Sequence, residues 1–133
     1  MSFGNGAVIA ISSKQKLNAR SSTDAELIGA DDVMSPLLWT RLFLEAQGID
    51  VQENTLYQDN KSAIILAENG KASSGKRTGA LNIRFFFIHD QVKQGNLRIV
   101  YCPTLDMRAD YFTKPLQGKL FHEHRAFIMG FDL

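Results

Sequence analysis

The order of apolar and polar positions in the first half of the chain predicts a strand followed by a long helix. The apolar run Ala7–Ile11 comes directly after Gly-Asn-Gly, an order typical of a strand that leaves a hairpin turn. From residue 27 to residue 44 the apolar side chains recur at helical spacing, behind a run of hydroxyl residues that are good N-caps. A helix is therefore expected over residues 21–47, and Pro36 is expected to kink it or divide it in two.

The second half of the chain predicts two more strands and several short helices. Asn54–Asp59 is expected to be a strand, and Asn60 is placed to cap a helix that Gly70 ends. Lys71–Gly79 is rich in Ser, Gly and Lys, and we expect a loop there. Leu81–Lys93 contains three successive phenylalanines and fits a helix or a strand on propensity alone. The remaining expected elements are a strand over Leu97–Cys102, a short helix over Thr104–Lys114 and an amphipathic helix over Lys119–Met129.

This order of elements indicates an α/β protein in which helices cover the faces of a sheet. With 133 residues, the chain is long enough for one domain with a single core. Its hydrophobic content of 44% and charged content of 22% argue against disorder. The lone Cys102 excludes an internal disulfide, and no apolar run reaches membrane-spanning length. We therefore expect an intracellular protein with no membrane partner.

Three carboxylates stand at expected element boundaries. Glu26 lies in the first turns of the long helix, Asp59 ends a strand, and Asp110 lies in the short helix near the C-terminus. Taken singly, each has a simpler interpretation, as a helix cap, a helix-dipole partner or a solvated surface acid. Taken together, three acids on separate elements are typical of a site for Mg²⁺, which binds through a few carboxylates and substrate phosphate.

Four motifs give these acids a family context. They are SSTDAE at residues 21–26, YQDNKSAIILAENG at 57–70, KRT at 76–78, and VYCPTLDMRADYFTKPL at 100–116. In order and spacing they resemble the ribonuclease H domain of a copia-type retrotransposon polyprotein. The resemblance implies a ribonuclease H-like α/β fold, a mixed sheet flanked by helices. It also implies that Leu81–Lys93 is a helix, that residues 1–116 are a partial domain, and that residues 117–133 are a C-terminal amphipathic helical tail.

The resemblance further implies a metal-dependent hydrolysis of the RNA strand of RNA/DNA hybrids. Glu26, Asp59 and Asp110 would be the catalytic acids and metal ligands, holding two Mg²⁺ ions, with Mn²⁺ as a substitute. The implied partners are the RNA/DNA hybrid and the reverse transcriptase domain of the same polyprotein. The implied location is the cytoplasm, with the nucleus as the alternative.

Polar and basic residues near these motifs are candidates for binding the substrate phosphates. The net charge of +1 means that nucleic-acid affinity has to come from local groups of this kind and from metal. The alternative is that the basic residues belong to solvated loops. The substrate-binding candidates are Lys14, Arg20, Ser22, Asn60, Arg77 and Lys114.

Two departures from the family pattern bear on activity. The family's first Asp lies on a strand upstream of anything matched here, so we expect the fold to lack its first strand and most of its second. At positions 79 and 80 the chain has Gly79 and Ala80, where the family normally has a basic residue and a histidine. We therefore expect a weak or inactive enzyme, with self-association through unpaired strands.

Two other functions remain open on this sequence. One is a non-catalytic retrotransposon remnant that at most binds nucleic acid or self-associates. The other is a domesticated interaction module that would form a defined oligomer through the Lys119–Met129 helix. The first catalytic Asp discriminates between the enzyme and the remnant. If another segment supplies this Asp, the enzyme is favoured, and otherwise the remnant is favoured.

Overall fold

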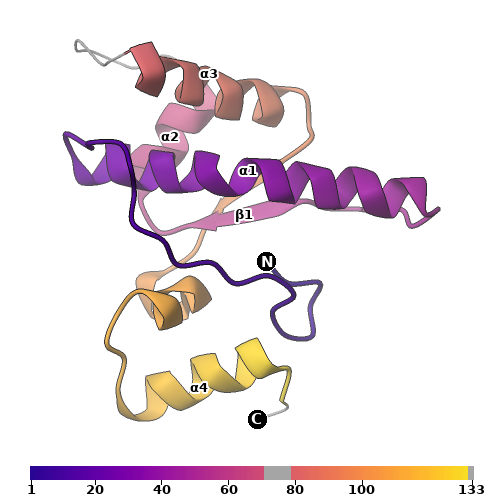
Figure 1. Ribbon diagram of the computed structural model, residues 1–133, viewed down its shortest axis with the longest axis vertical. Coiled ribbons are helices and arrows are strands. Elements are labelled where there is room, and N and C mark those ends of the chain that lie inside the picture. Colours follow the sequence, from indigo (N-terminus) through magenta and orange to yellow (C-terminus); the bar gives the residue numbers. More distant parts are fainter. Residues whose placement is uncertain (71–78, 132–133) are drawn as a thin grey trace. The chain divides into compact units, whose positions relative to one another are not determined.

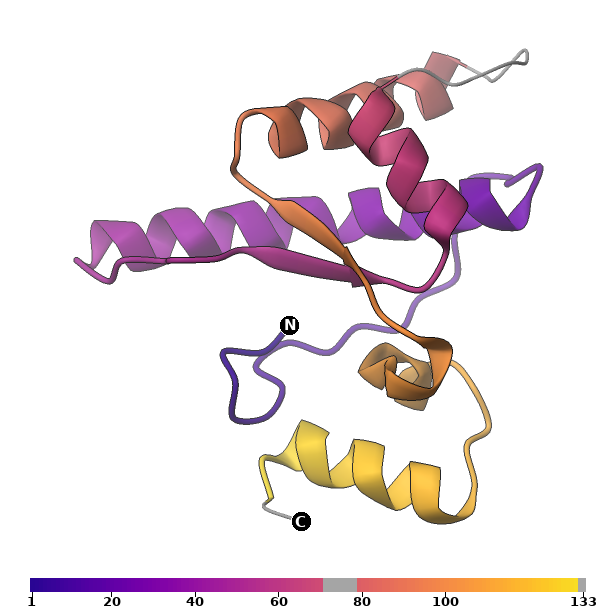
Figure 2. The same cartoon turned by 180° about the vertical axis from the view of Figure 1, so that it is seen from behind.

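The computed structural model describes residues 1–70 and 79–131 (Figures 1 and 2). The chain forms two compact units, which are described separately. The larger unit is Gln15–Cys102, and the smaller unit combines Met1–Lys14 with Pro103–Leu133. The boundary expected after residue 116 stays a prediction. None of the helices in the described ranges is both long enough and apolar enough to cross a membrane.

The larger unit is built around helix α1, Ser22–Ala46. Ser21 is its N-cap and accepts a hydrogen bond from the Asp24 amide at 3.1 Å, which satisfies one of the free donors of the first turn. Pro36 lies inside the helix, where it removes one main-chain donor. The helix nevertheless continues without interruption, so the expected division in two does not occur.

Two short strands form the sheet of the larger unit. β1, Thr55–Gln58, runs parallel to β2, Arg98–Tyr101, with Thr55 opposite Arg98 and Gln58 opposite Tyr101. Over the described residues the sheet has these two strands only, rather than the expected larger mixed sheet. The main-chain oxygens of Asn54 and Gln58 accept hydrogen bonds from the β2 side. Because main-chain groups alternate along a strand, those of Thr55 and Tyr57 point to the other edge of β1.

Helices α2, Lys61–Asn69, and α3, Gly79–Lys93, pack against each other and both contact α1 (Figures 1 and 2). The segment Leu81–Lys93, which fitted a helix or a strand on propensity alone, is helical because it belongs to α3. Its buried residues Phe85 and Ile88 are spaced by one helical turn, whereas Phe86 and Phe87 remain exposed. The buried core of this unit consists of Leu27, Ile28, Ala30, Met34, Ala63, Ala67, Phe85, Ile88, Leu97 and Ile99.

Helix α2 ends at Gly70, whose left-handed backbone conformation cannot continue a right-handed helix. Gly70 has a φ of 68°, in the left-handed region that L-residues with a Cβ rarely adopt. A Cβ at this position would also collide with the His89 ring. His89 is held there by a hydrogen bond of 3.1 Å between its Nδ1 and the Ala67 carbonyl. The C-terminal end of α2 is thus fitted closely to α3.

The smaller unit contains no strand over its described residues, and the prediction of a strand at Ala7–Ile11 is wrong. A single antiparallel bridge joins Ser2 to Ala7 around the glycine-rich turn. The amides of Val8 and Ile9 both donate to the Met1 carbonyl, at 2.9 and 3.4 Å, so the pairing stops at Met1. Over the described residues, the apolar run therefore forms this one bridge and no strand ladder.

Up to residue 131, where the described part ends, the C-terminal part of the smaller unit contains three helical segments. The expected helix over Thr104–Lys114 is instead two 3₁₀ helices, η1 at Thr104–Asp106 and η2 at Arg108–Phe112. Met107 separates them, because its extended conformation interrupts the helical hydrogen bonds. The predicted amphipathic helix is confirmed as α4, Gly118–Met129, which packs against η2.

Candidate functional site

The carboxyl end of β1 leads directly into α2 through a turn held by side chains. Gln58 is buried, and its Oε1 accepts a hydrogen bond from the Asn60 amide at 3.0 Å. The Asn60 side chain in turn accepts from the Ala63 amide at 3.1 Å, which confirms it as the N-cap of α2. Asp59 lies between these two residues, half-buried. Its position is therefore fixed by hydrogen bonds on both sides.

The same turn contacts the start of α1. The Asn60 Nδ2 donates a long hydrogen bond of 3.5 Å to the Thr23 Oγ1. Glu26 lies one helical turn after Thr23, and Asp59 directly precedes Asn60. The structure therefore brings the segments that carry Glu26 and Asp59 together at one end of the larger unit.

This end of the larger unit combines carboxylates with the N-termini of two helices. Mg²⁺ in phosphate-processing sites is often bound by one or two carboxylates plus substrate oxygens, so Glu26 and Asp59 suit such an ion chemically. Free amides at helix N-termini favour phosphate oxygens in the same region. Over its described residues, neither unit gathers three or more His, Cys, Asp or Glu side chains that could hold a metal ion. The pair is thus the part of the expected acid set that the larger unit contributes.

Asp110, the third expected acid, belongs to the smaller unit and lies in η2. Its Oδ2 forms an ion pair of 2.7 Å with the Lys114 ammonium, one turn later. The main-chain amides of Thr113 and Lys114 both donate to the Asp110 carbonyl, at 3.1 and 2.8 Å. Lys114, a predicted phosphate contact, is therefore engaged with the carboxylate of Asp110 in this structure.

The remaining substrate-binding candidates are distributed over both units. Ser22 is the exposed first residue of α1, and Arg20 directly precedes the N-cap of the same helix. Lys14 is exposed and belongs to the smaller unit. Arg77 lies outside the described residues, together with the loop expected from Lys71. Ser22, Arg20 and Asn60 thus share the α1–α2 end of the larger unit.

Sequence reasoning missed three residues at this end. Gln58 and Thr23 hold the turn, and a polar residue at an inward strand position was the available signal for Gln58. Lys61 is the third: its ammonium lies 4.8 Å from the centre of the Tyr101 ring, at the carboxyl ends of both strands. A cation in the first turn of a helix opposes the helix dipole, and this was the signal for Lys61.

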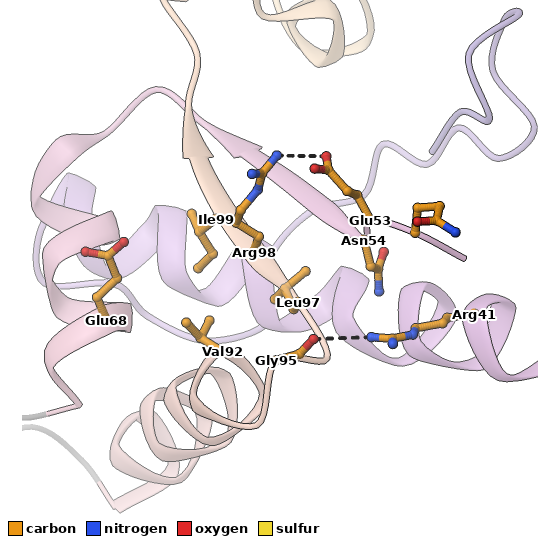
Figure 3. A pocket seen from close by; sticks show the side chains of 10 residues that line it. Arg41, Glu53, Asn54, Glu68, Val92, Gly95, Leu97, Arg98 and Ile99 are labelled. Atoms are coloured by element: carbon orange, nitrogen blue, oxygen red, sulfur yellow. Dashed lines mark hydrogen bonds and ion pairs between the residues drawn. The ribbon is translucent and has the colours of Figure 1, made fainter. Parts of the chain in front are cut away.

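A pocket of about 380 Å³ lies at the opposite end of the sheet (Figure 3). Its apolar wall consists of Val92, Leu97 and Ile99, and residues at the starts of both strands line it. Three of the charged side chains that line it have partners: Arg98 pairs with Glu53 at 2.8 Å, and Arg41 donates to the carbonyl of Gly95. None of the three expected acids is among the residues that line the pocket.

Comparison with known proteins identifies relatives among retrotransposon polyproteins. The chain is 32% identical over 119 residues to the retrovirus-related Pol polyprotein from transposon TNT 1-94 of Nicotiana tabacum, a match that covers 90% of this chain and 9% of that protein. It is 38% identical over 111 residues to the Pol polyprotein from transposon RE2 of Arabidopsis thaliana, covering 83% and 8% respectively. For transposon RE1 of the same plant the identity is 37% over 118 residues, covering 88% and 8%.

The chain spans less than a tenth of the length of these relatives. No family model matches it, and no solved structure matches it. What the comparisons establish is ancestry: this chain is homologous to a short segment of copia-type retrotransposon Pol polyproteins.

Proposed function

We propose that this chain is the ribonuclease H segment of a retrotransposon Pol polyprotein, which hydrolyses the RNA strand of RNA/DNA hybrids. The observation that carries the proposal is the hydrogen bond between Asn60 and Thr23, which joins the turn after Asp59 to the helix of Glu26. Two acids at the ends of separate elements are what a metal-dependent phosphodiesterase requires. A parallel strand pair with helices packed beside it supports a ribonuclease H-like fold for the larger unit.

The residues of this chain have distinct roles in the proposed reaction. Glu26, Asp59 and Asp110 would hold Mg²⁺ or Mn²⁺, which when bound supply the charge that stabilises the attacking and leaving oxygens. Gln58 and Asn60 hold Asp59 in place through the turn that they fix. Lys61 lies at the same ends of the strands, where its ammonium would contact a substrate phosphate.

The proposed partners follow from the proposed ribonuclease H function. The substrate is an RNA/DNA hybrid, and the neighbour in the polyprotein is its reverse transcriptase domain, in the cytoplasm. In the domain that the motifs resemble, one more Asp is supplied by a strand upstream. β1 has an edge at which the main-chain groups of Thr55 and Tyr57 are directed outward, and such an edge accepts a further strand. We expect the upstream strand to pair there.

The test is cleavage of a labelled RNA/DNA hybrid in Mg²⁺ and in Mn²⁺. By itself, the chain is expected to cleave weakly or not at all, since a missing ligand misplaces the reacting groups, and a displacement of one ångström can cost on the order of 10²-fold in rate. Addition of the polypeptide that precedes the homologous segment in the RE1 polyprotein should raise cleavage. The rise should disappear in Asp59→Asn, which removes a ligand charge.

The matched control is Asp50→Asn, which removes the same charge from an exposed residue before β1. This variant should retain all of the cleavage gained. A hybrid that stays intact with every added polypeptide, in both metals, would refute the enzymatic proposal. Equal cleavage by wild type and Asp59→Asn would indicate a contaminating ribonuclease.

A second candidate function is self-association without catalysis, and one surface favours it. Trp39 and Phe43 stack on the surface of α1 with their ring centres 5.2 Å apart, and the side chains are 64% and 48% exposed. Leu42 beside them is 65% exposed. Apolar surface of this kind often marks a contact with another protein. Sedimentation equilibrium of wild type and Trp39→Ser decides this: a concentration-dependent oligomer that the substitution abolishes supports the second candidate.

A further inference from the structure

The smaller unit contains a fully buried histidine whose protonation state is set by its neighbour. His124 of α4 is 0% exposed, and its Nδ1 lies 2.7 Å from an Nη1 of Arg108. A guanidinium has donors only, so the imidazole nitrogen accepts this hydrogen bond. His124 is therefore neutral, with its proton on Nε2. The Nε2 atom is buried.

Arg108 is held by α4 in a second way. Its guanidinium lies 5.1 Å from the centre of the Phe127 ring, one turn after His124. One face of α4 thus provides both an acceptor and an aromatic ring for the same cation. Arg108 is the first residue of η2, so these contacts fix the start of that helix.

The other end of η2 is held by α4 as well. Tyr111 stacks on Phe121 of α4, with the ring centres 5.3 Å apart. Asp110 lies between Arg108 and Tyr111, and its amide donates to the Met107 carbonyl at 3.1 Å. The carboxylate of Asp110 is therefore carried by a short helix that α4 contacts on both sides of it.

We propose that His124 is a positioning residue for Asp110, acting through its hydrogen bond with Arg108. This inference rests on the proposed function only for the metal-binding role given to Asp110. His124 does not touch the metal or the substrate; it sets the orientation of η2 and hence of the Asp110 carboxylate. The C-terminal helix α4 is accordingly part of the metal-binding machinery of the smaller unit.

The test compares His124→Leu, which removes the acceptor, with His122→Leu, an exposed histidine on the same helix. Amide exchange of residues 108–114 in the full chain, followed by NMR, should accelerate about tenfold or more in His124→Leu, because one charge-assisted hydrogen bond is lost. His122→Leu should exchange like wild type. His124→Asn restores an acceptor near the Nδ1 position and should recover most of the protection.

A second readout uses Mn²⁺ alone, without substrate. Paramagnetic broadening of the Asp110 resonances should be present in wild type, lost in His124→Leu and recovered in His124→Asn. Broadening that is unchanged in His124→Leu would overturn the inference. If wild type shows no broadening at Asp110, Asp59 or Glu26, the proposed metal function fails, while the exchange data still decide whether His124 orders η2.

A third readout needs no variant and remains valid if His124→Leu does not fold. The ¹⁵N spectrum of the histidine rings should show an unprotonated Nδ1 and a protonated Nε2 for His124 at neutral pH. A proton on Nδ1 would overturn the inference, because that nitrogen could not then accept from Arg108.

Discussion

Arg41 and Asn96 are joined by a hydrogen bond of 2.9 Å between the guanidinium Nη1 and the main-chain carbonyl, across 55 positions of sequence. The bond connects the second half of α1 to the turn between α3 and β2. Arg41 also pairs with Glu45 at 2.9 Å, one turn later on the same helix. The long-range bond has the larger structural consequence, because the pair with Glu45 stays within α1.

The first prediction follows from this bond. Arg41→Met should lower the free energy of unfolding by about 2 kcal/mol, because it removes a charged donor from a partly buried carbonyl. Glu45→Gln should change it by less than about 1 kcal/mol, since an exposed pair within one helix contributes little. Urea unfolding followed by circular dichroism measures both. Equal losses in the two variants would contradict the prediction.

The second prediction concerns Gly70 and a matched glycine. Gly48→Ala places a Cβ in open space at a φ of 82° and should cost about 1 kcal/mol of backbone strain. Gly70→Ala adds a collision with the His89 ring and should cost about 2–4 kcal/mol in total. Chemical denaturation compares the two variants. In a His89→Ala background the collision is absent, so adding Gly70→Ala there should cost about as much as Gly48→Ala does in wild type.

The third prediction concerns pH. Burial lowers the pKa of His124 below its ordinary value of 6.5, and the Arg108 cation lowers it further. Asp110, Glu123 and the Met107 backbone act in the opposite direction, and the net shift is downward. The unfolded chain therefore binds a proton at His124 more readily than the folded chain.

The sign of the pH effect follows from that difference. The stability associated with neutral His124 is complete above pH 6.5 and is lost as the pH falls below 6.5 towards the folded pKa. Unfolding free energies measured between pH 7.5 and pH 5.5 should decline in wild type and decline less in His124→Asn. His122→Asn is the control and should follow wild type.

The fourth prediction separates the two roles of Asn60. Asn60→Ala removes the cap of α2 and should cost about 1 kcal/mol in stability. Asn60→Asp retains a capping oxygen but removes the Nδ2 donor to Thr23, so stability should stay close to that of wild type. In the complemented hybrid-cleavage assay, however, Asn60→Asp should reduce the rate. A rate equal to that of wild type would remove the Asn60–Thr23 contact from the proposed site.

The local part of the fold could be predicted from sequence because its determinants are local. Ser21 and Asn60 cap helices and Gly70 ends one, and each effect depends on a few neighbouring residues. The prediction of a strand at Ala7–Ile11 was wrong because a strand needs a partner strand, and an apolar run does not reveal whether one exists. The secondary structure of Leu81–Lys93 stayed ambiguous because three successive phenylalanines show neither the helical spacing of about 3.6 residues nor the strand spacing of two. Burial of Phe85 and Ile88 against the other helices decides that segment.

The candidate site was predictable only in part, for a similar reason. The motifs indicated Glu26 and Asp59 as site residues. The structure brings their segments together through Thr23, a residue of the SSTDAE motif to which no role had been given. Gln58 and Lys61 lie within two residues of Asp59 in sequence. The contact of Lys61 depends on Tyr101, however, and the burial of Gln58 depends on the position of the strand. Asp110 was expected on one helix, and it lies instead on a 3₁₀ turn that α4 supports.

The parallel pairing of β1 with β2 has a consequence for the synthesis of the chain. Asn54, just before β1, donates a hydrogen bond to the Asn96 carbonyl, just before β2, across 42 positions. At 5–20 residues per second, a ribosome needs roughly 2–8 s to make that interval. During this time the edge of β1 that pairs with β2 lacks that partner, so the hydrogen-bonding groups of this edge are open to other nascent chains. The sheet can form only after α2 and α3 have been made, which makes late closure and sensitivity to the translation rate the expected folding behaviour of this unit.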